Sequence, residues 1–106
     1  MLLIAAALQE ELEIAMALCQ DPERVAGLPV DVWQTVHGGA IIRFLKTGVG
    51  PKRSAASLER ALQFFRPASV LVTGYAGALD PGLRLGSLVV ARKALLGQHA
   101  PQGLYG

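Results

Sequence analysis

The stretch over residues 68–92 constrains what this chain can fold into more than any other. It opens on a short apolar run at residues 70–72 and reaches a small-residue cluster, TGYAGA, at 73–78. An Asp-Pro-Gly turn at 80–82 separates this cluster from a second apolar run at 88–91. Such runs, bounded by Gly and Pro, predict two buried strands. A strand that ends in glycines lets a ligand approach the backbone, and open α/β sheets bind small molecules at such strand ends.

The first half of the chain alternates between strand and helix patterns. Residues 2–8 form a continuous apolar run, which is typical of a central strand covered on both faces. Residues 9–19 carry apolar side chains at helical spacing and predict a helix. The strand patterns at 32–37 and 40–46 flank two adjacent glycines, which is the signal of a two-residue hairpin.

A second helix is predicted over residues 51–65, because Pro51 follows a glycine-rich turn and suits the first position of a helix. Its apolar residues recur at helical spacing and are expected to face the core: Ala55, Leu58, Ala61, Leu62 and Phe65. The predicted order is β-α-β-β-α-β-β. It implies an α/β fold, with a mixed central sheet flanked by helices.

Composition narrows the class of protein and its partners. The chain has 106 residues, 52% of them hydrophobic and 17% charged, which predicts one small globular domain. The net charge of +2 is scattered, so neither nucleic acid nor a membrane is an expected partner. Cys19 is the single cysteine, and His37 and His99 have no partner at ligand spacing, so no metal and no cofactor is expected. We expect a cytoplasmic location.

Three segments together resemble the purine nucleosidase and nucleoside phosphorylase superfamily. They are IAAALQEELEIA at residues 4–15, LKTGVGPKRSAA at 45–56 and TGYAGALDPGLRLGSLVVA at 73–91. The resemblance is greatest to the N-terminal half of methylthioadenosine/adenosylhomocysteine nucleosidases and futalosine hydrolases. It implies a partial nucleoside phosphorylase-like domain over residues 1–94, and residues 95–106 are expected to be a loose tail or a truncated segment of the family domain.

The resemblance assigns a catalytic role to Glu11. In the nucleosidases this pattern places a glutamate just after the first strand, where it helps to hold the attacking water against the anomeric carbon of the ribose. Such a group is needed because the sugar departs as an oxocarbenium-like cation and water alone is a poor nucleophile. The alternative reading is an ordinary acidic residue in the first turn of a helix, where the dipole favours negative charge.

The resemblance also implies a set of substrate-binding positions. Beside the glutamate, two residues match the floor of the pocket, and a residue inside Gly48-Val49-Gly50 matches the group that meets the 5′ substituent. Small residues at the end of the 70–72 strand match those against which the purine and ribose lie, because larger side chains would close the pocket. Plain packing is the alternative for all of them. The positions are Ala7, Leu8, Val49, Gly74, Ala76 and Gly77.

Two departures from the phosphorylase branch of the family bear on the reaction. That branch places an arginine and a small hydroxyl residue on phosphate, and this chain has Val72 and Tyr75 at those positions. Because a phosphate dianion needs a cation or several convergent donors, hydrolysis is favoured over phosphorolysis. Tyr75 is assigned to substrate binding, where its ring could stack on a base or occlude the site. Lys52 and Arg53 at the predicted helix start could form an anion site, although a solvated face explains them too.

The family's ribose-gripping Glu-Met-Glu segment and its leaving-group Ser-Asp pair have no counterpart among the 106 residues. The expected function is therefore the N-terminal portion of a purine nucleoside N-glycosidase, and the chain alone is expected to be inactive or weak. The alternatives are a non-catalytic remnant that serves self-association or partner binding, and a nucleoside phosphorylase. A purine nucleoside is the expected ligand. A homodimer or higher oligomer is expected, because half a domain leaves a sheet edge unpaired.

Overall fold

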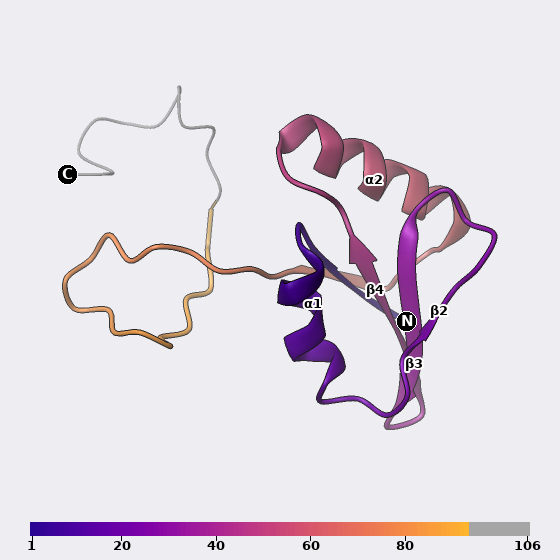
Figure 1. Cartoon of the computed structure of the whole chain (residues 1–106), viewed down its shortest axis with the longest axis horizontal. Helices are drawn as coiled ribbons and strands as arrows, with labels where there is room; N and C mark the ends of the chain where they lie inside the picture. Colours follow the sequence, from indigo (N-terminus) through magenta and orange to yellow (C-terminus); the bar gives the residue numbers. More distant parts are fainter. Residues whose placement is uncertain (94–106) are drawn as a thin grey trace. The chain divides into compact units, whose positions relative to one another are not determined.

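The computed structural model describes residues 1–93, which belong to two compact units. The first unit is Met1–Tyr75, and it contains every helix and strand found among the described residues (Figure 1). The second unit begins at Ala76. Within residues 1–93, neither helix is long and apolar enough to cross a bilayer.

A five-stranded mixed sheet forms the centre of the first unit, in the order β2-β3-β4-β1-β5. The strands and helices are β1 (Leu2–Ala6), α1 (Gln9–Met16), β2 (Glu23–Arg24), β3 (Asp31–His37), β4 (Ala40–Lys46), α2 (Pro51–Phe64) and β5 (Ser69–Val72). β1 pairs in parallel with both β4 and β5, whereas β3 pairs antiparallel with β2 and β4. The α/β class and the mixed sheet agree with the prediction, and the carboxyl ends of β1, β4 and β5 meet at one edge.

The β3–β4 hairpin closes as its sequence predicts. Gly38 and Gly39 have φ angles of 58° and 80°, and two successive residues of positive φ are the mark of a type I′ turn. This turn sets a register that pairs Trp33 with Phe44 across the two strands. β4 is thereby fixed between the hairpin on one side and β1 on the other.

The sheet has a core on each face, with α1 against one and α2 against the other (Figure 1). Phe44 and Leu45 are adjacent in β4, both are fully buried, and they belong to opposite cores. This alternation is the period of a strand covered on both faces. The core on the α2 side contains Leu3, Ala5, Val30, Val32, Leu45 and Ala61. The core on the α1 side contains Ala6, Leu12 and Phe44.

The predicted inner face of α2 is partly wrong. Ala61 is buried and Leu58 and Phe65 are half-buried, but Ala55 and Leu62 are exposed. The helix instead turns its serine side toward the end of β4, where two serine hydroxyls bond backbone carbonyls. α1 also ends at Met16 rather than at Cys19, because the Leu18 and Cys19 amides bond three residues back in a tighter turn.

The second predicted strand of the 68–92 stretch is absent. Residues 88–91 form no strand, and Leu88 and Val90 are 90% and 82% exposed. A strand needs a hydrogen-bonded neighbour, and no residue between 76 and 93 provides one. The strand before it does form, as β5, but its four residues are exposed rather than buried, because β5 is an edge strand with β1 as its one neighbour. The two-residue β2 was not predicted.

The described part of the second unit consists of turns, bends and chain without regular secondary structure. Its Asp-Pro-Gly turn forms as predicted: the Asp80 carboxylate accepts a hydrogen bond from the Gly82 amide at 2.7 Å, and the Asp80 carbonyl accepts one from the Leu83 amide at 3.0 Å. The tail expected over residues 95–106 lies outside the described residues, so the predicted boundary at residue 94 stays a prediction.

Candidate functional site

Backbone pairing continues past the ends of the three parallel strands. The Thr47 amide donates to the Ala6 carbonyl at 2.8 Å, and the Gly48 amide donates to the Ala7 carbonyl at 3.1 Å. On the other side, the Thr73 amide donates to the Ala5 carbonyl at 2.9 Å. Three segments distant in sequence are therefore held together at the edge where α/β sheets place ligands.

A cavity of about 270 Å³ opens at this edge. We call it the apolar cavity, because small and aliphatic side chains form most of its wall and Glu11 is the one charged residue among the described residues that line it. The strand ends and α2 supply its lining: Ala5, Ala6, Ala7, Glu11, Thr47, Ser54, Ala55, Leu58, Val72 and Thr73. Its size is close to the lower end of the range for small-molecule sites.

Glu11 bridges the start of α1 and the segment after β5. One oxygen, Oε1, accepts a hydrogen bond from the Leu8 amide at 3.0 Å, which ties the carboxylate back to the beginning of its own helix. The other oxygen, Oε2, accepts one from the Tyr75 amide at 2.8 Å, across 64 residues of sequence. These two bonds fix the carboxylate at the rim of the apolar cavity.

Gly74 leaves the space that this carboxylate occupies. A Cβ atom at position 74 would lie 2.6 Å from Oε2 of Glu11, which is closer than non-bonded atoms approach. A side chain there would therefore displace the carboxylate or the strand end. The resemblance assigns Gly74 to the small residues that keep the pocket open, and in the structure the residue beside it is Glu11.

The other predicted residues take different places. Ala7 lines the apolar cavity, whereas Leu8 and Tyr75 are 43% and 68% exposed and reach Glu11 through their backbone amides. Val49 is 65% exposed and lines neither cavity described here. Ala76 and Gly77 belong to the second unit, in which a Cβ at Gly77 would meet open space. Their predicted roles stay predictions.

Sequence reasoning missed a cluster of hydroxyl groups behind the strand ends. The buried Thr47 hydroxyl lies 3.0 Å from the Gly48 carbonyl and 3.3 Å from the Ser54 hydroxyl. Ser54 donates to the Gly48 carbonyl at 3.1 Å, and Ser57 donates to the Thr47 carbonyl at 2.9 Å. The signal was two serines three residues apart, which places them on one face of α2.

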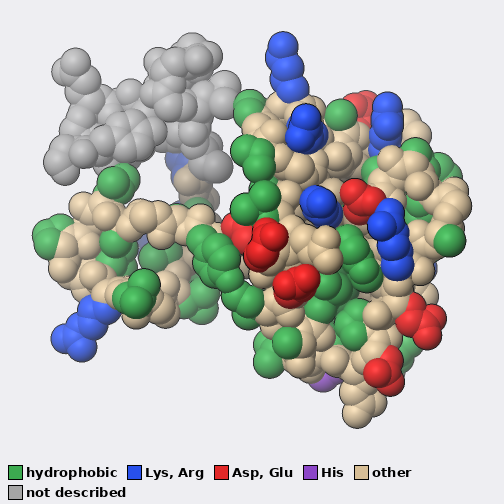
Figure 2. All heavy atoms as spheres, in the orientation of Figure 1, with side chains coloured by type: hydrophobic (Ala, Val, Ile, Leu, Met, Phe, Trp, Pro, Cys, Tyr) green, Lys and Arg blue, Asp and Glu red, His purple; other side chains and the backbone are tan. Residues whose placement is uncertain are grey.

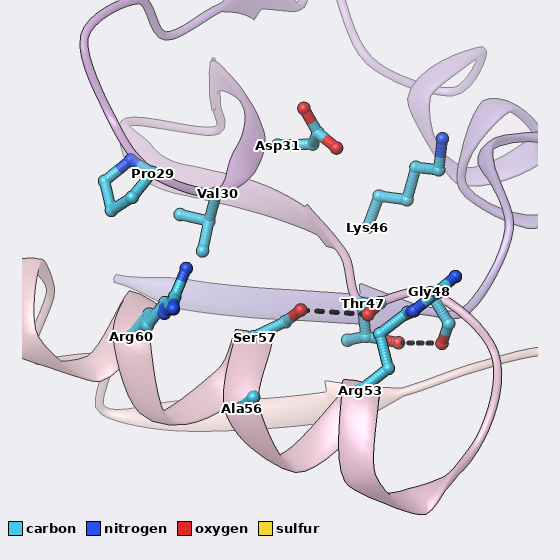
Figure 3. Close-up of a pocket in the computed structure, with 10 residues that line it drawn as sticks. All are labelled: Pro29, Val30, Asp31, Lys46, Thr47, Gly48, Arg53, Ala56, Ser57 and Arg60. Carbon is cyan, nitrogen blue, oxygen red and sulfur yellow. Dashed lines mark hydrogen bonds between the residues drawn. The ribbon is translucent and has the colours of Figure 1, made fainter.

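A second cavity, of about 400 Å³, also has Thr47 in its lining (Figure 3). We call it the cationic cavity, because three basic side chains line it, and Figure 2 shows Lys and Arg side chains gathered over the region of α2. Its lining comes from the segment before β3, the end of β4 and one face of α2: Pro29, Val30, Asp31, Lys46, Thr47, Gly48, Arg53, Ala56, Ser57 and Arg60.

Comparison with known proteins finds relatives for most of the chain. A model of the Phosphorylase superfamily matches residues 2–103. A 5′-methylthioadenosine/S-adenosylhomocysteine nucleosidase of Actinobacillus succinogenes is 33% identical over 89 residues, which are 83% of this chain and 38% of that protein. The chain thus spans less than half of the length of the curated relatives that it matches.

Solved structures agree on the fold. A mutant of the Helicobacter pylori nucleosidase MTAN, crystallised with 5′-methylthioadenosine in its active site, aligns with a TM-score of 0.69 at 23% identity, over 78% of this chain and 36% of that one. A mutant futalosine hydrolase of the same organism aligns with a TM-score of 0.66 at 23% identity, over 78% and 38%. The family model covers both the strand ends and the glycine-rich stretch. On this match, the chain belongs to the phosphorylase superfamily.

Proposed function

We propose that this chain forms the nucleoside-binding part of a purine nucleoside N-glycosidase of the methylthioadenosine/adenosylhomocysteine/futalosine type. The observation that carries the proposal is the position of Glu11, whose carboxylate is held by two backbone amides at the rim of the apolar cavity. The matched relatives bear the name of nucleosidases, which supports the same class of substrate.

In the proposed reaction the bond between C1′ of the ribose and the purine nitrogen breaks, and the oxygen of a water molecule bonds to C1′. The purine takes up one proton from the solvent as it leaves, and the water gives up one proton when its oxygen becomes the C1′ hydroxyl, so the protons balance. Glu11 would accept a hydrogen bond from the attacking water, and its negative charge would stabilise the oxocarbenium-like transition state. Its Oε2 now accepts one hydrogen bond from the Tyr75 amide, and an ionised carboxylate oxygen has a second lone pair for the water.

The apolar cavity favours hydrolysis over phosphorolysis. Val72 lines it at the position where the phosphorylases place an arginine, and neither Lys nor Arg is among its lining residues. The single charged residue in the wall, Glu11, would repel a phosphate dianion. A nucleoside phosphorylase is therefore the weaker candidate for this site.

The test is binding and cleavage of methylthioadenosine by the purified chain. We expect saturable binding, monitored by shifts of the Ala7 and Thr73 amide signals in NMR spectra. Glu11→Gln should weaken it by roughly tenfold, because one charge-assisted hydrogen bond is lost. Release of adenine should be slow, and Glu11→Gln should lower its rate by roughly 10²–10⁴.

Glu13→Gln is the matched control, because Glu13 is an exposed acid on the same helix that bonds only the Gln9 side chain. Equal losses in the two variants would contradict the assignment of Glu11. Formation of a ribose 1-phosphate in phosphate buffer would contradict the preference for hydrolysis. Because the chain has no counterpart of the leaving-group acid named above, turnover as fast as that of the full-length nucleosidases would overturn the expectation of a weak catalyst.

A second candidate function is self-association without catalysis, for which we propose another copy of this chain as the partner. The exposed edge strand β5 favours it, since Val70, Leu71 and Val72 are 44%, 52% and 73% exposed. Edge strands with apolar side chains are templates for pairing. Light scattering should then give a mass of at least twice 11.2 kDa. A monomer that binds methylthioadenosine would exclude this candidate.

A cytoplasmic location remains a prediction.

A further inference from the structure

The cationic cavity has a wall that one helix face provides. Arg53, Ser57 and Arg60 recur at intervals of four and three residues, so they project from the same side of α2 (Figure 3). Ala56 and Ser57 lie between the two arginines, and their small side chains leave the middle of the wall open. The arginine backbones are about 10 Å apart, at a rise of about 1.5 Å per residue.

The positive charge of this cavity is not neutralised within the described residues. Lys46, Arg53 and Arg60 make no ion pair with any residue from 1 to 93. The one carboxylate in the wall, that of Asp31, is already paired with Arg24. Three cations line one cavity and repel each other, and an anion bound between them would offset this repulsion.

Two basic residues at the start of α2, one of which lines the cavity, are unfavourable for the helix itself. Lys52 and Arg53 lie in the first turn of α2, which has no acidic residue there, and the helix dipole disfavours cations at that end. A bound anion would reverse this penalty for Arg53, whose side chain lines the cavity. It would not do so directly for Lys52, which does not line it.

Gly48 gives the Arg53 side chain its place. A Cβ at position 48 would lie 2.2 Å from the Arg53 Cδ atom, and Gly48 has a φ of 81°, which side chains rarely adopt. The stem of Arg53 therefore crosses directly over the Gly48 backbone. This contact holds the arginine against the cavity wall, so the cation is positioned before any ligand arrives.

We propose that the cationic cavity binds the phosphate or diphosphate group of a small molecule. A volume of about 400 Å³ suits a small ligand rather than a macromolecular surface, and Arg side chains present a planar set of donors that matches phosphate oxygens. This site is separate from the apolar cavity, and it stands whether or not the chain binds a nucleoside. Arg53 and Arg60 bind the anion from α2, and Lys46 binds it from the end of β4.

The test is an NMR titration of the full 106-residue chain with sodium pyrophosphate and, separately, with inorganic phosphate, each against sodium chloride at equal ionic strength. We expect saturable shifts of the Thr47, Gly48 and Ser57 amides with the phosphate compounds and none that saturate with chloride. Arg53→Gln and Arg60→Gln should each weaken binding by roughly tenfold. Both side chains are exposed, so the variants should keep the fold and the dispersion of the spectrum.

Lys52→Gln is the matched control, because it removes the same charge from the same turn of α2 at a residue that does not line the cavity. It should weaken binding by less than about twofold, through the long-range field alone. Equal losses in Lys52→Gln and Arg53→Gln would mean that general positive charge attracts the anion, and would overturn the proposal. So would shifts that rise linearly with pyrophosphate and never saturate.

Discussion

The apolar cavity and the cationic cavity share a wall and little else. Thr47 lines both, at the point where β4 ends. On one side the wall continues through the ends of β1 and β5 and part of α2, and its described residues carry a single negative charge, that of Glu11. On the other side it continues along α2 and carries three positive charges and Asp31. One strand end can thus serve two cavities of opposite charge, according to what packs against each side of it.

Charge, rather than position in the fold, distinguishes the two proposed ligands. The proposed nucleoside is neutral, which suits the apolar cavity, because an anion would meet Glu11 there. A phosphate group fits the cationic cavity, where an uncharged ligand would leave three cations without a partner. Variants that affect one cavity and spare the other are therefore the sharpest way to examine the comparison.

The largest effect is expected for Gly74→Ala. Its Cβ would lie 2.6 Å from Oε2 of Glu11, so the carboxylate must shift, and we expect its bond from the Tyr75 amide to be weakened or lost. We expect the affinity for methylthioadenosine to fall by roughly tenfold or more. Pyrophosphate binding should stay unchanged. Isothermal titration with each compound measures both.

The comparison would fail if Gly74→Ala weakened both ligands equally, since the two cavities would then be one site. Hydrogen exchange of the Tyr75 amide gives an independent readout. The exchange should become faster in Gly74→Ala if the bond to Glu11 is lost. An unchanged exchange rate would show that the carboxylate is not displaced.

Thr47→Val should have the next largest effect, and it should weaken both ligands. The buried hydroxyl bonds the Gly48 carbonyl at 3.0 Å, and the variant keeps its shape but removes that bond. We expect the free energy of unfolding to fall by about 1 kcal/mol in urea titrations. Thr73→Val is the control, because its side chain is exposed and its expected change is within about 0.5 kcal/mol. An equal loss of unfolding free energy in Thr47→Val and Thr73→Val would contradict the inference that the Thr47 hydroxyl stabilises the wall shared by the two cavities.

The smallest effects are expected for a pair of serine variants that divide the two cavities. Ser54 lines the apolar cavity and Ser57 lines the cationic cavity, one turn apart on α2. Each donates one hydrogen bond to the segment at residues 47–48, so Ser54→Ala and Ser57→Ala should each cost about 0.5–1 kcal/mol of stability. Ser54→Ala should shift the nucleoside affinity more, and Ser57→Ala the pyrophosphate affinity. The reverse order would contradict the assignment of the walls.

The parts of the fold that local chemistry determines could be predicted from the sequence. Gly38 and Gly39 specify the hairpin, because their positive φ angles suit the turn that joins β3 and β4. Local sequence could not show whether residues 88–91 form a strand. A strand also needs a hydrogen-bonded neighbouring strand, and an apolar run does not reveal whether one is present. The same holds for β5, whose exposure follows from its place at the edge of the sheet.

In the candidate site, too, the residues could be selected from the sequence, but their contacts depend on how distant segments pack. The resemblance singles out Glu11 and Gly74, but their contact across the chain depends on β1 and β5 lying side by side, which no local pattern contains. Lys52 and Arg53 drew attention as a basic helix start, whereas Arg60 did not. Its place in the wall depends on which face α2 turns inward, and the predicted face was partly wrong: Ser57, which was not predicted to face inward, bonds the Thr47 carbonyl.

The strand order also determines when the parts of the molecule can come together during synthesis. β1 emerges from the ribosome first, but its partners begin at Ala40 and Ser69, so it has to wait while the β3–β4 hairpin can close by itself. β1 gains its second neighbour only after β5 is made. The bond from the Tyr75 amide to Glu11 requires three residues more. The apolar cavity therefore completes its wall at the end of the folding of this unit, whereas every residue of the cationic cavity has been made by Arg60.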